Sequence, residues 1–489
     1  NQEWFEMADL RRRKLNESVW IPLRALGTLE EVGKIGYVGF RSEFFGAGSI
    51  AVPLHQKAIA ERLTWSDVGT SRSHIGSVVD GTYVPADVFD DRGLNAVALV
   101  LEQDGNSEDP TEWHLHQDLV IALDLKREGD VWLAMKEGYL EVARLKRREG
   151  SPSLLEIRAE HLKDYLCARG MGLYVSSYRN REETVIDASY ILWAAPPPVE
   201  QNSEGDRWEG RLSEIHEGGD AFGSSAAVLM IGRENVDFGE DVPAISPSDE
   251  NIFTRSWTIN REGPKLVRIQ GELWRNEWVF PAEKSPRVRR DELPPSVFFV
   301  TDAEGTRRDG RSLQGDGGWL WFRPDVMMAL SHRRGGAMRW YTRDTGGVRC
   351  SPTSSFTAFG VNKLGFVNVY AKDIGCLPEW QQKLWAGFNI SPEGGVSEEL
   401  LAAQAKGIPA ETQAPEAFLQ PAIQFLNEIS TEKFGFRLFR EHDQFASLLK
   451  SAHRFRATDQ LSVFSLAKDL AKLTAEGIDA SALQKIVPP

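Results

Sequence analysis

The sequence predicts an α+β fold: two mixed strand and helix domains followed by a helical C-terminal domain. Of its 489 residues, 41% are hydrophobic and 26% are charged. Short β-rich runs dominate up to about residue 395, and helical periodicity follows. This composition is typical of a folded globular protein, because it provides enough apolar surface to offset the entropy of ordering the chain. The length predicts roughly three domains.

Changes in composition and charge set the expected boundaries. We expect an N-terminal α+β domain at 1–195, an acidic linker or loop region at 196–250, a basic, Trp-rich α+β domain at 251–395 and a helical domain at 396–489. Residues 200–250 carry 13 acidic and 3 basic side chains, and the three prolines before them are typical of a stiff linker. Residues 251–349 carry 18 basic and 12 acidic side chains.

Local patterns assign the elements within these domains. Alternation predicts strands at Val297–Val300 and Gly365–Tyr370. In the last domain Ser397 reads as a helix N-cap followed by two glutamates, which suit a helix N-terminus. We expect prolines 409, 415 and 421 to divide this domain into short helices. The sequence stops at Val487-Pro488-Pro489, and we expect the natural chain to extend further.

Three stretches share one layout, which favours an internal repeat. Residues 154–174 and 319–341 both read as a strand, an acidic helix start, a short helix, an Arg-Gly stop and a second strand, and residues 112–133 follow the same order. An acid suits a helix N-terminus and a glycine suits the C-terminal stop. The alternative is that strand–helix–strand units of this kind recur by general rules.

Charge and cysteine content exclude several classes of protein. The formal charge is −14, and no apolar run approaches the length of a membrane-spanning helix. The start of the chain is charged and lacks the features of a signal peptide. Cys167, Cys350 and Cys376 are too few and too scattered for a disulfide framework or a zinc ribbon. We therefore expect a cytoplasmic protein from a reducing compartment, with no membrane association.

One metal-site hypothesis rests on His114, His116 and Asp118. On a strand the two histidines would face the same side, and imidazoles with a carboxylate can hold zinc, manganese or iron. No third histidine or cysteine with ligand spacing follows. Because a convincing site needs a full ligand set, half-buried or surface histidines are the favoured interpretation, and we predict neither metal nor cofactor.

A second catalytic hypothesis rests on Arg437 and His442. In these two residues the spacing resembles that of HEPN ribonucleases, in which arginine and histidine would act on RNA without metal. Arg211 and His216 have the same spacing, so chance is the favoured explanation. The sequence also lacks a Gly-x-Ser-x-Gly elbow and a phosphate-binding glycine loop. Whether the protein is an enzyme stays open, and the balance favours a protein without catalysis.

Between residues 255 and 349, arginines interleave with aromatic residues. Guanidinium groups can bind phosphates while aromatic rings stack on bases. The alternative is that the tryptophans fill a core and the arginines form a solvated face. The candidate nucleic-acid-binding residues are Trp274, Arg275, Arg289, Arg290, Arg323, Arg339, Trp340 and Arg343.

Residues 377–398 contain Leu-Pro-Glu-Trp-Gln-Gln-Lys-Leu-Trp and then Asn-Ile-Ser-Pro-Glu-Gly-Gly-Val-Ser-Glu. This segment resembles one found in large uncharacterised bacterial proteins, some of them associated with antiphage defence genes. It covers about a tenth of the chain, reads physically as two short helices around a Pro/Gly turn, and carries no known activity.

Together these observations predict a non-enzymatic binding or sensing subunit of a bacterial intracellular system, of which antiphage defence is the setting that the resemblance implies. The expected partners are nucleic acid, through the basic aromatic region 255–349, and a protein, through the C-terminal helices. The alternative is a phosphodiesterase or ribonuclease that uses His114, His116 and Asp118 with metal, or Arg437 and His442 without it.

Overall fold

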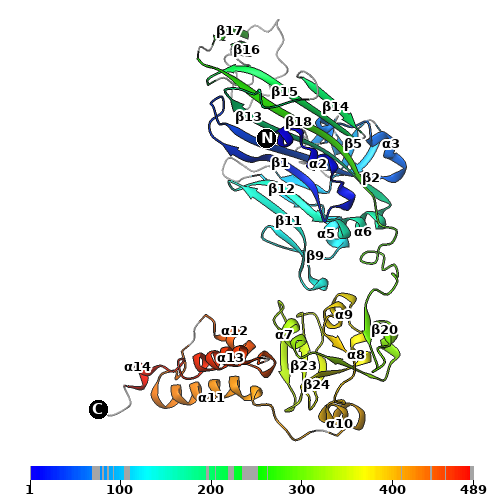
Figure 1. The fold of residues 1–489 in the computed structure, drawn as a ribbon, viewed down its shortest axis with the longest axis vertical. Helices are drawn as coiled ribbons and strands as arrows, with labels where there is room; N and C mark the ends of the chain where they lie inside the picture. Colours follow the sequence, from blue (N-terminus) through cyan, green and yellow to red (C-terminus); the bar gives the residue numbers. More distant parts are fainter. Residues whose placement is uncertain are drawn as a thin grey trace. The chain divides into compact units, whose positions relative to one another are not determined.

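A computed structural model describes most of the chain (Figure 1). The described residues are 2–68, 77–79, 82–84, 88–91, 93–103, 111–193, 198–203, 205–218, 225–233, 252–260, 263–408, 410–440, 443–457 and 459–484. The chain divides into two compact units: unit 1 comprises Asn1–Leu133 and Glu141–Glu292, and unit 2 comprises Ala134–Leu140 and Leu293–Pro489. The described residues confirm an α+β fold with a large sheet and a helical C-terminal region.

The boundary between the two units, after Glu292, falls within the expected basic domain. Residues 251–292 of the expected basic domain belong to unit 1, whereas residues 293–395 and the helical region belong to unit 2. Within the expected acidic linker, Val199–Ser203 and Asp206–His216 are paired strands of the large sheet. These strands are stabilised by cross-strand ion pairs, which the linker-like composition does not reveal.

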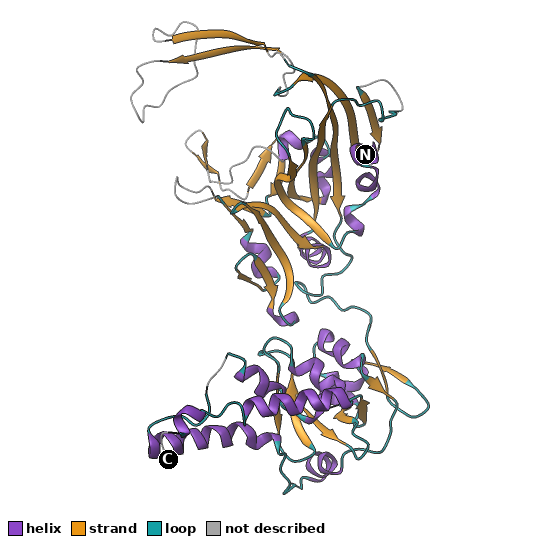
Figure 2. Ribbon diagram, turned by 60° about the vertical axis from the view of Figure 1, so that its left-hand side comes forward, coloured by secondary structure: helices purple, strands orange, loops and turns teal. Residues whose placement is uncertain are grey.

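Twelve of the described strands form one sheet in unit 1. In spatial order its main path is β14 (Val199–Ser203), β15 (Asp206–His216), β18 (Lys265–Val279), β13 (Met171–Val185), β2 (Arg41–Pro53), β1 (Trp20–Val32), β12 (Ser151–Arg158), β11 (Leu140–Arg148), β10 (Val131–Ala134) and β9 (Leu125–Glu128), with β6 (Leu94–Val97) on β2 and β5 (Val88–Asp91) on β6. Figure 2 shows that its long strands are curved and twisted, as expected for L-residues.

The central strand β13 is held by pairing on both sides. It runs antiparallel to β2 and to β18 over almost its whole length. Its charged side chains are matched across the strands: Arg179 pairs with Glu43 of β2 at 2.8 Å, and Glu182 pairs with Arg268 of β18. Opposite charges on neighbouring strands stabilise a sheet, so a strand as polar as β13 can lie at its centre.

The other described elements of unit 1 are short. The helices are α1 (Gln2–Glu6), α2 (Ala8–Arg12), α3 (Lys57–Ala60), α4 (Trp65–Val68), α5 (Gln117–Ala122) and α6 (Ala159–Arg169), with 3-10 turns η1 (Leu15–Glu17) and η2 (Leu54–Gln56). The separate strand pairs are β3 (Ser77–Val79) with β4 (Thr82–Val84), β7 (Val100–Gln103) with β8 (Glu112–Leu115), and β16 (Ser225–Arg233) with β17 (Ile252–Asn260).

Residues 2–18, here called the N-terminal segment, pack on one face of the large sheet; Figure 1 shows α2 beside β18. Phe5 and Met7 are completely buried. The indole nitrogen of Trp208 donates a hydrogen bond to the Phe5 carbonyl at 2.9 Å, and Arg181 donates one to the Trp4 carbonyl at 2.7 Å. Apolar burial and donors from the sheet together hold the segment in place.

Gly271 of β18 provides the space for this contact. A Cβ atom at this position would lie 2.2 Å from the Phe5 carbonyl oxygen. This oxygen belongs to the backbone, so it cannot rotate away as a side chain could. We expect Gly271→Ala to lower the free energy of unfolding by about 1–3 kcal/mol, the usual range for overpacking, and to make the N-terminal segment more sensitive to protease. Urea denaturation and limited proteolysis would measure both effects. Gly263→Ala is the control, because its Cβ would meet nothing closer than 3.6 Å; equal losses in the two variants would contradict the prediction.

Unit 2 is built on a six-stranded sheet. Its order is β22 (Ala337–Trp340), β23 (Thr345–Arg349), β24 (Thr357–Val361), β25 (Val367–Tyr370), β21 (Trp319–Phe322) and β26 (Asn389–Ile390), and β19 (Phe298–Val300) pairs separately with β20 (Arg307–Asp309). The helices α7 (Asp325–Ser331), α8 (Ala371–Gly375) and α9 (Glu379–Ala386) complete one core, in which Phe322 and Trp385 are fully buried. The 3-10 turns are η3 (Met135–Glu137), η4 (Ser312–Gly315) and η5 (Arg454–Arg456).

The helical region of unit 2 contains α10 (Glu398–Lys406), α11 (Glu416–Phe434), α12 (Phe445–Ser451), α13 (Gln460–Leu473) and α14 (Ala480–Leu483). The predicted N-cap is confirmed, since the Ser397 hydroxyl accepts from the Leu400 amide. The expected break at Pro421 is wrong, because α11 continues through it. Pro421 is exposed, so water can solvate the carbonyl that loses its donor. Pro409 lies outside the described residues.

The three stretches with a shared layout all contain a strand, a helix and a second strand: β8–α5–β9, β12–α6–β13 and β21–α7–β22. Their sheet positions differ. β12 and β13 are separated by β1 and β2, whereas β21 and β22 are separated by β23, β24 and β25. The local layout is therefore present in all three, and a common origin as a repeat stays a prediction.

Candidate functional site

The eight candidate nucleic-acid-binding residues are divided between the two units. Trp274, Arg275, Arg289 and Arg290 lie in unit 1, and Arg323, Arg339, Trp340 and Arg343 lie in unit 2. Neither unit contains the whole set, and each group has partners of its own.

Arg275 is buried and has structural partners. Its guanidinium lies 3.1 Å from Asp206 and 2.9 Å from Glu277, and it donates to the carbonyls of Leu10 and Arg13. Burial raises the pKa of both carboxyls, although the positive charge of Arg275 acts in the opposite direction. With its donors used within unit 1, Arg275 holds the N-terminal segment to β18.

The other three candidates in unit 1 do not gather into one patch. Trp274 is half-buried against the ring of Tyr178, and the guanidinium of Arg207 lies 5.1 Å from its centroid. Arg289 is exposed and forms an ion pair with Asp291 at 2.6 Å. Arg290 is exposed in a left-handed backbone conformation, with φ of 62°.

In unit 2 three candidates are similarly engaged. Arg323 lies over the ring of Phe388 and donates to the Gly387 carbonyl at 3.2 Å. Arg343 pairs with Asp344 at 2.9 Å. Trp340 belongs to the interior: its ring stacks on Phe455 with centroids 5.5 Å apart.

Arg339 belongs to a different arrangement, built by the β22–β23 hairpin. In the register Ala337 lies opposite Arg349 and Arg339 lies opposite Gly347, so Arg339 and Arg349 share one face of the hairpin. The guanidinium groups of Arg339 and Arg349 lie 4.1 and 4.9 Å from the centroid of Phe356. Neither arginine has an ion pair with any described carboxylate.

Tyr341 extends this face. Its hydroxyl accepts a hydrogen bond from Nε of Arg339 at 2.8 Å, and its side chain is 49% exposed. Gly347 makes this possible, because a Cβ there would lie 2.5 Å from the Tyr341 hydroxyl. We call Arg339, Tyr341, Arg349 and Phe356 the arginine–aromatic surface.

Two members of this surface, Arg349 and Phe356, were absent from the sequence-based candidates. Residues 345–348 are all buried and Arg349 is half-buried, so period-two alternation along this strand gives no signal for Arg349. Phe356 is a single aromatic residue between serines and a threonine, a pattern that indicates an accessible ring. Their proximity depends on the pairing of β22 with β23 and on the loop that follows β23.

In the structure His114, His116 and Asp118 each have a different partner. Nδ1 of His114 lies 2.9 Å from a guanidinium nitrogen of Arg127, and burial lowers the pKa of His114, with a smaller contribution from Arg127. His116 caps α5 by accepting from the Asp118 amide. The Asp118 carboxylate is bound by Arg169 at 2.6 Å. Within the described ranges, no group of three or more His, Cys, Asp or Glu side chains could hold a metal ion.

The Arg437–His442 hypothesis is only partly visible, because His442 lies outside the described residues. Arg437 lines a cavity of about 740 Å³ with Glu428, Glu432 and Arg440. The described C-terminal helices also expose large apolar side chains. They are Phe418, Phe425, Leu426 and Phe434 on α11 and Leu461, Val463 and Phe464 on α13. A protein partner for these helices stays a prediction.

Comparison with models of protein families and with curated proteins found no match for this chain. Within the described part of the chain, no helix combines the length and the apolar character needed to span a bilayer.

Proposed function

We propose that the protein is a non-enzymatic binding or sensing protein that contacts nucleic acid through the arginine–aromatic surface of unit 2. One observation supports this most strongly: Arg339 and Arg349 lie over the same aromatic ring, and neither is paired with a described carboxylate. Other candidate arginines, such as Arg275, Arg289 and Arg343, already have acidic partners.

The chemistry of this surface favours single-stranded nucleic acid. Guanidinium groups form strong charge-assisted hydrogen bonds with phosphates, and exposed aromatic rings stack on unpaired bases. Residues 319–349 carry six arginines and two aspartates. Because binding responds to local charge, a positive patch of this kind can bind phosphate despite the chain's net charge of −14. The resemblance of residues 377–398 supports bacterial antiphage defence as the setting.

The double variant Arg339→Ala/Arg349→Ala should bind a labelled 20-nucleotide single strand at least tenfold more weakly. The slope of log K against log salt should become shallower by about 1.4, because each phosphate contact on a single strand contributes about 0.7. Fluorescence anisotropy at several salt concentrations measures both quantities. The matched control is Arg343→Ala, which removes an exposed but paired arginine of the same unit and should change affinity less than twofold. Equal losses in the two variants would refute the assignment of this surface.

A cleavage assay tests the non-enzymatic part of the proposal. The same oligonucleotide, and an RNA of equal sequence, should remain intact on a gel after incubation with the protein and manganese. Cleavage would favour the alternative enzyme, and its dependence on manganese would distinguish the His114 site from the Arg437 site.

A further inference from the structure

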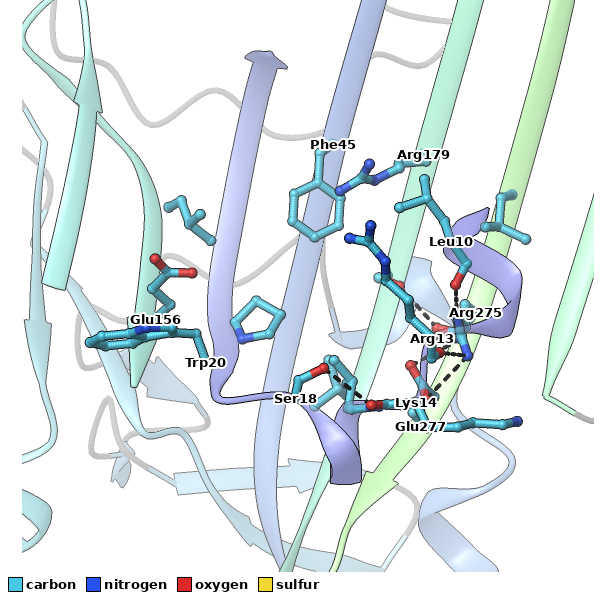
Figure 3. A pocket seen from close by; sticks show the side chains of 16 residues that line it. Leu10, Arg13, Lys14, Ser18, Trp20, Phe45, Glu156, Arg179, Arg275 and Glu277 are labelled. Carbon is cyan, nitrogen blue, oxygen red and sulfur yellow. Dashed lines mark hydrogen bonds and ion pairs between the residues drawn. The ribbon is translucent and has the colours of Figure 1, made fainter. Parts of the chain in front are cut away.

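Unit 1 contains a pocket that the proposed function does not use. It has a volume of about 310 Å³ and lies between the N-terminal segment and one face of the large sheet. Its floor is formed by β12, β1, β2, β13 and β18, and its wall by residues 10–18 (Figure 3). Pockets of this volume are suited to small organic molecules.

Strand register determines which side chains form the floor. Arg179 of β13 lies opposite Phe45 of β2 on one side and Leu273 of β18 on the other, so these three residues form one row. In the next row Ser177 lies opposite Ala47 and Arg275. The short side chains of Ser177 and Ala47 leave space beside the longer side chains of the first row.

The wall is fixed by the same charge cluster that holds the N-terminal segment. Arg275 donates to the carbonyls of Leu10 and Arg13, and the amide of Leu15 donates to Glu277 at 3.1 Å. Arg13 is therefore attached to β18 through its backbone, and its side chain is available to the pocket. Among the described residues its guanidinium has no ion pair, and the neighbouring Arg12 does not line the pocket.

Positive charge is in excess at the end of the pocket near Phe45. Figure 3 shows the guanidinium groups of Arg13 and Arg179 near the Phe45 ring, and that of Arg179 lies 4.5 Å from the ring centroid. Arg179 pairs with Glu43, but Arg181 shares this carboxylate at 3.2 Å. Burial lowers the pKa of Arg179, and the charge of Arg181 adds to this effect, whereas the charges of Glu43 and Asp9 raise the pKa.

Three arginines therefore face two carboxylates, of which Asp9 is exposed. The remaining charge is one positive unit at the edge of the pocket, whose lining combines polar groups with the apolar side chains of Phe45, Leu154, Val175 and Leu273. An anion placed there would gain strong hydrogen bonds from Arg179, whose side chain is 22% exposed, and from Arg13, which is exposed.

The pocket contains other charged groups that define its polarity. Glu156, at the opposite side near Trp20, pairs with Lys146 at 3.0 Å and with Arg144. The guanidinium of Arg144 covers the Trp20 ring at 4.0 Å. Glu156 is neutralised there, and Glu277 is used by Arg275 and the Leu15 amide. Lys14, which also lines the pocket and is exposed, adds a positive charge to the wall near Glu277. The lining as a whole therefore carries excess positive charge.

We propose that this pocket binds a small organic anion that joins a phosphate or carboxylate head to an apolar or aromatic body. The head lies between Arg13 and Arg179, and the body lies against Phe45, Leu154 and Val175. Among the described residues that line the pocket there is no histidine and no cysteine, which is consistent with binding rather than chemistry.

Titration calorimetry with phenyl phosphate and with 4-phenylbutyrate tests this inference, and benzyl alcohol serves as the uncharged counterpart. At least one anion should bind, and the alcohol should bind at least tenfold more weakly. Arg13→Ala should weaken binding of the anion about tenfold or more, whereas Arg12→Ala should change it less than twofold. Ser177→Leu, which fills the floor, should abolish binding in a variant whose fold is checked by circular dichroism.

Binding of phenyl phosphate would indicate a phosphate head group, and binding of 4-phenylbutyrate would indicate a carboxylate head group. Absence of binding by both anions would overturn the inference, and so would binding that Arg13→Ala leaves unchanged. The double variant Arg339→Ala/Arg349→Ala should bind the anion as the parent protein does, so this inference and the proposed function succeed or fail separately.

Discussion

Arg275→Ala should lower the free energy of unfolding of unit 1 by about 3–5 kcal/mol, the range for breaking a buried ion pair by removing one partner. Asp206 and Glu277 have side chains that are only 6% and 16% exposed, and both would lose their guanidinium partner. The carbonyls of Leu10 and Arg13 would lose their donors as well. Urea denaturation would measure the loss. Arg289→Ala, which removes an exposed arginine paired with Asp291, should change the free energy of unfolding far less, because exposed ion pairs contribute little.

The difference between the parent protein and Arg275→Ala should also depend on pH. Burial already raises the pKa of Asp206 and Glu277 above their ordinary values, and loss of the positive charge should raise them further. A carboxyl whose pKa is higher in the folded state binds more protons when folded, so the stability that it contributes falls as pH rises. The loss in the variant should therefore be smallest below about pH 3, where both carboxyls are protonated in either state and only the loss of the hydrogen bonds to the Leu10 and Arg13 carbonyls remains. It should increase toward neutral pH, and a loss that is constant between pH 4 and 7 would contradict this account.

Trp385→Ala should have an effect of similar size in unit 2, about 3–5 kcal/mol. Trp385 is 1% exposed, and its ring meets Phe322 edge to face with centroids 4.8 Å apart. Removing it leaves a cavity in the core that α9 forms with the sheet, and the surrounding residues can fill such a cavity only in part. Chemical denaturation would measure the loss.

Trp380→Ala provides the matched control, because Trp380 lies on the same helix α9 and is only half-buried. Its truncation should cost less than half as much, since less apolar area leaves water in the folded protein. If the Trp380 variant lost as much stability as the Trp385 variant, the conclusion that Trp385 is the more deeply buried of the two in the core of unit 2 would be contradicted.

The sequence predicted those elements that depend on local chemistry. The N-cap at Ser397, the strand–helix–strand layouts and the helical C-terminal region all follow from residues close together in the chain. The hairpin of β14 and β15 was expected to be a linker, because Glu200, Asp206 and Glu209 suggest exposure. Glu200 and Glu209 pair with Arg207 and Arg211 within the hairpin, whereas Asp206 pairs with Arg275, which is remote in sequence.

For the candidate site, composition predicted that arginines and aromatic residues interleave, but it could not show which arginines have acidic partners. Arg275 and Arg339 each neighbour a tryptophan in the sequence, yet one is buried between carboxylates and the other lies over Phe356. The difference arises from strand register, since the residues that face each side chain belong to other strands. Arg349 joins Arg339 only because β22 and β23 pair as they do.

The attachment of the N-terminal segment to β18 has a consequence for the order of folding. The amide of Leu15 bonds to Glu277, and the side chain of Asn16 bonds to the Trp278 carbonyl, so residues 262 positions apart are joined. Contacts of such high sequence separation form slowly, because a long loop must close first. During synthesis Phe5 and Met7 cannot be buried against β18 until β18 has left the ribosome. Until then these apolar side chains are available to chaperones.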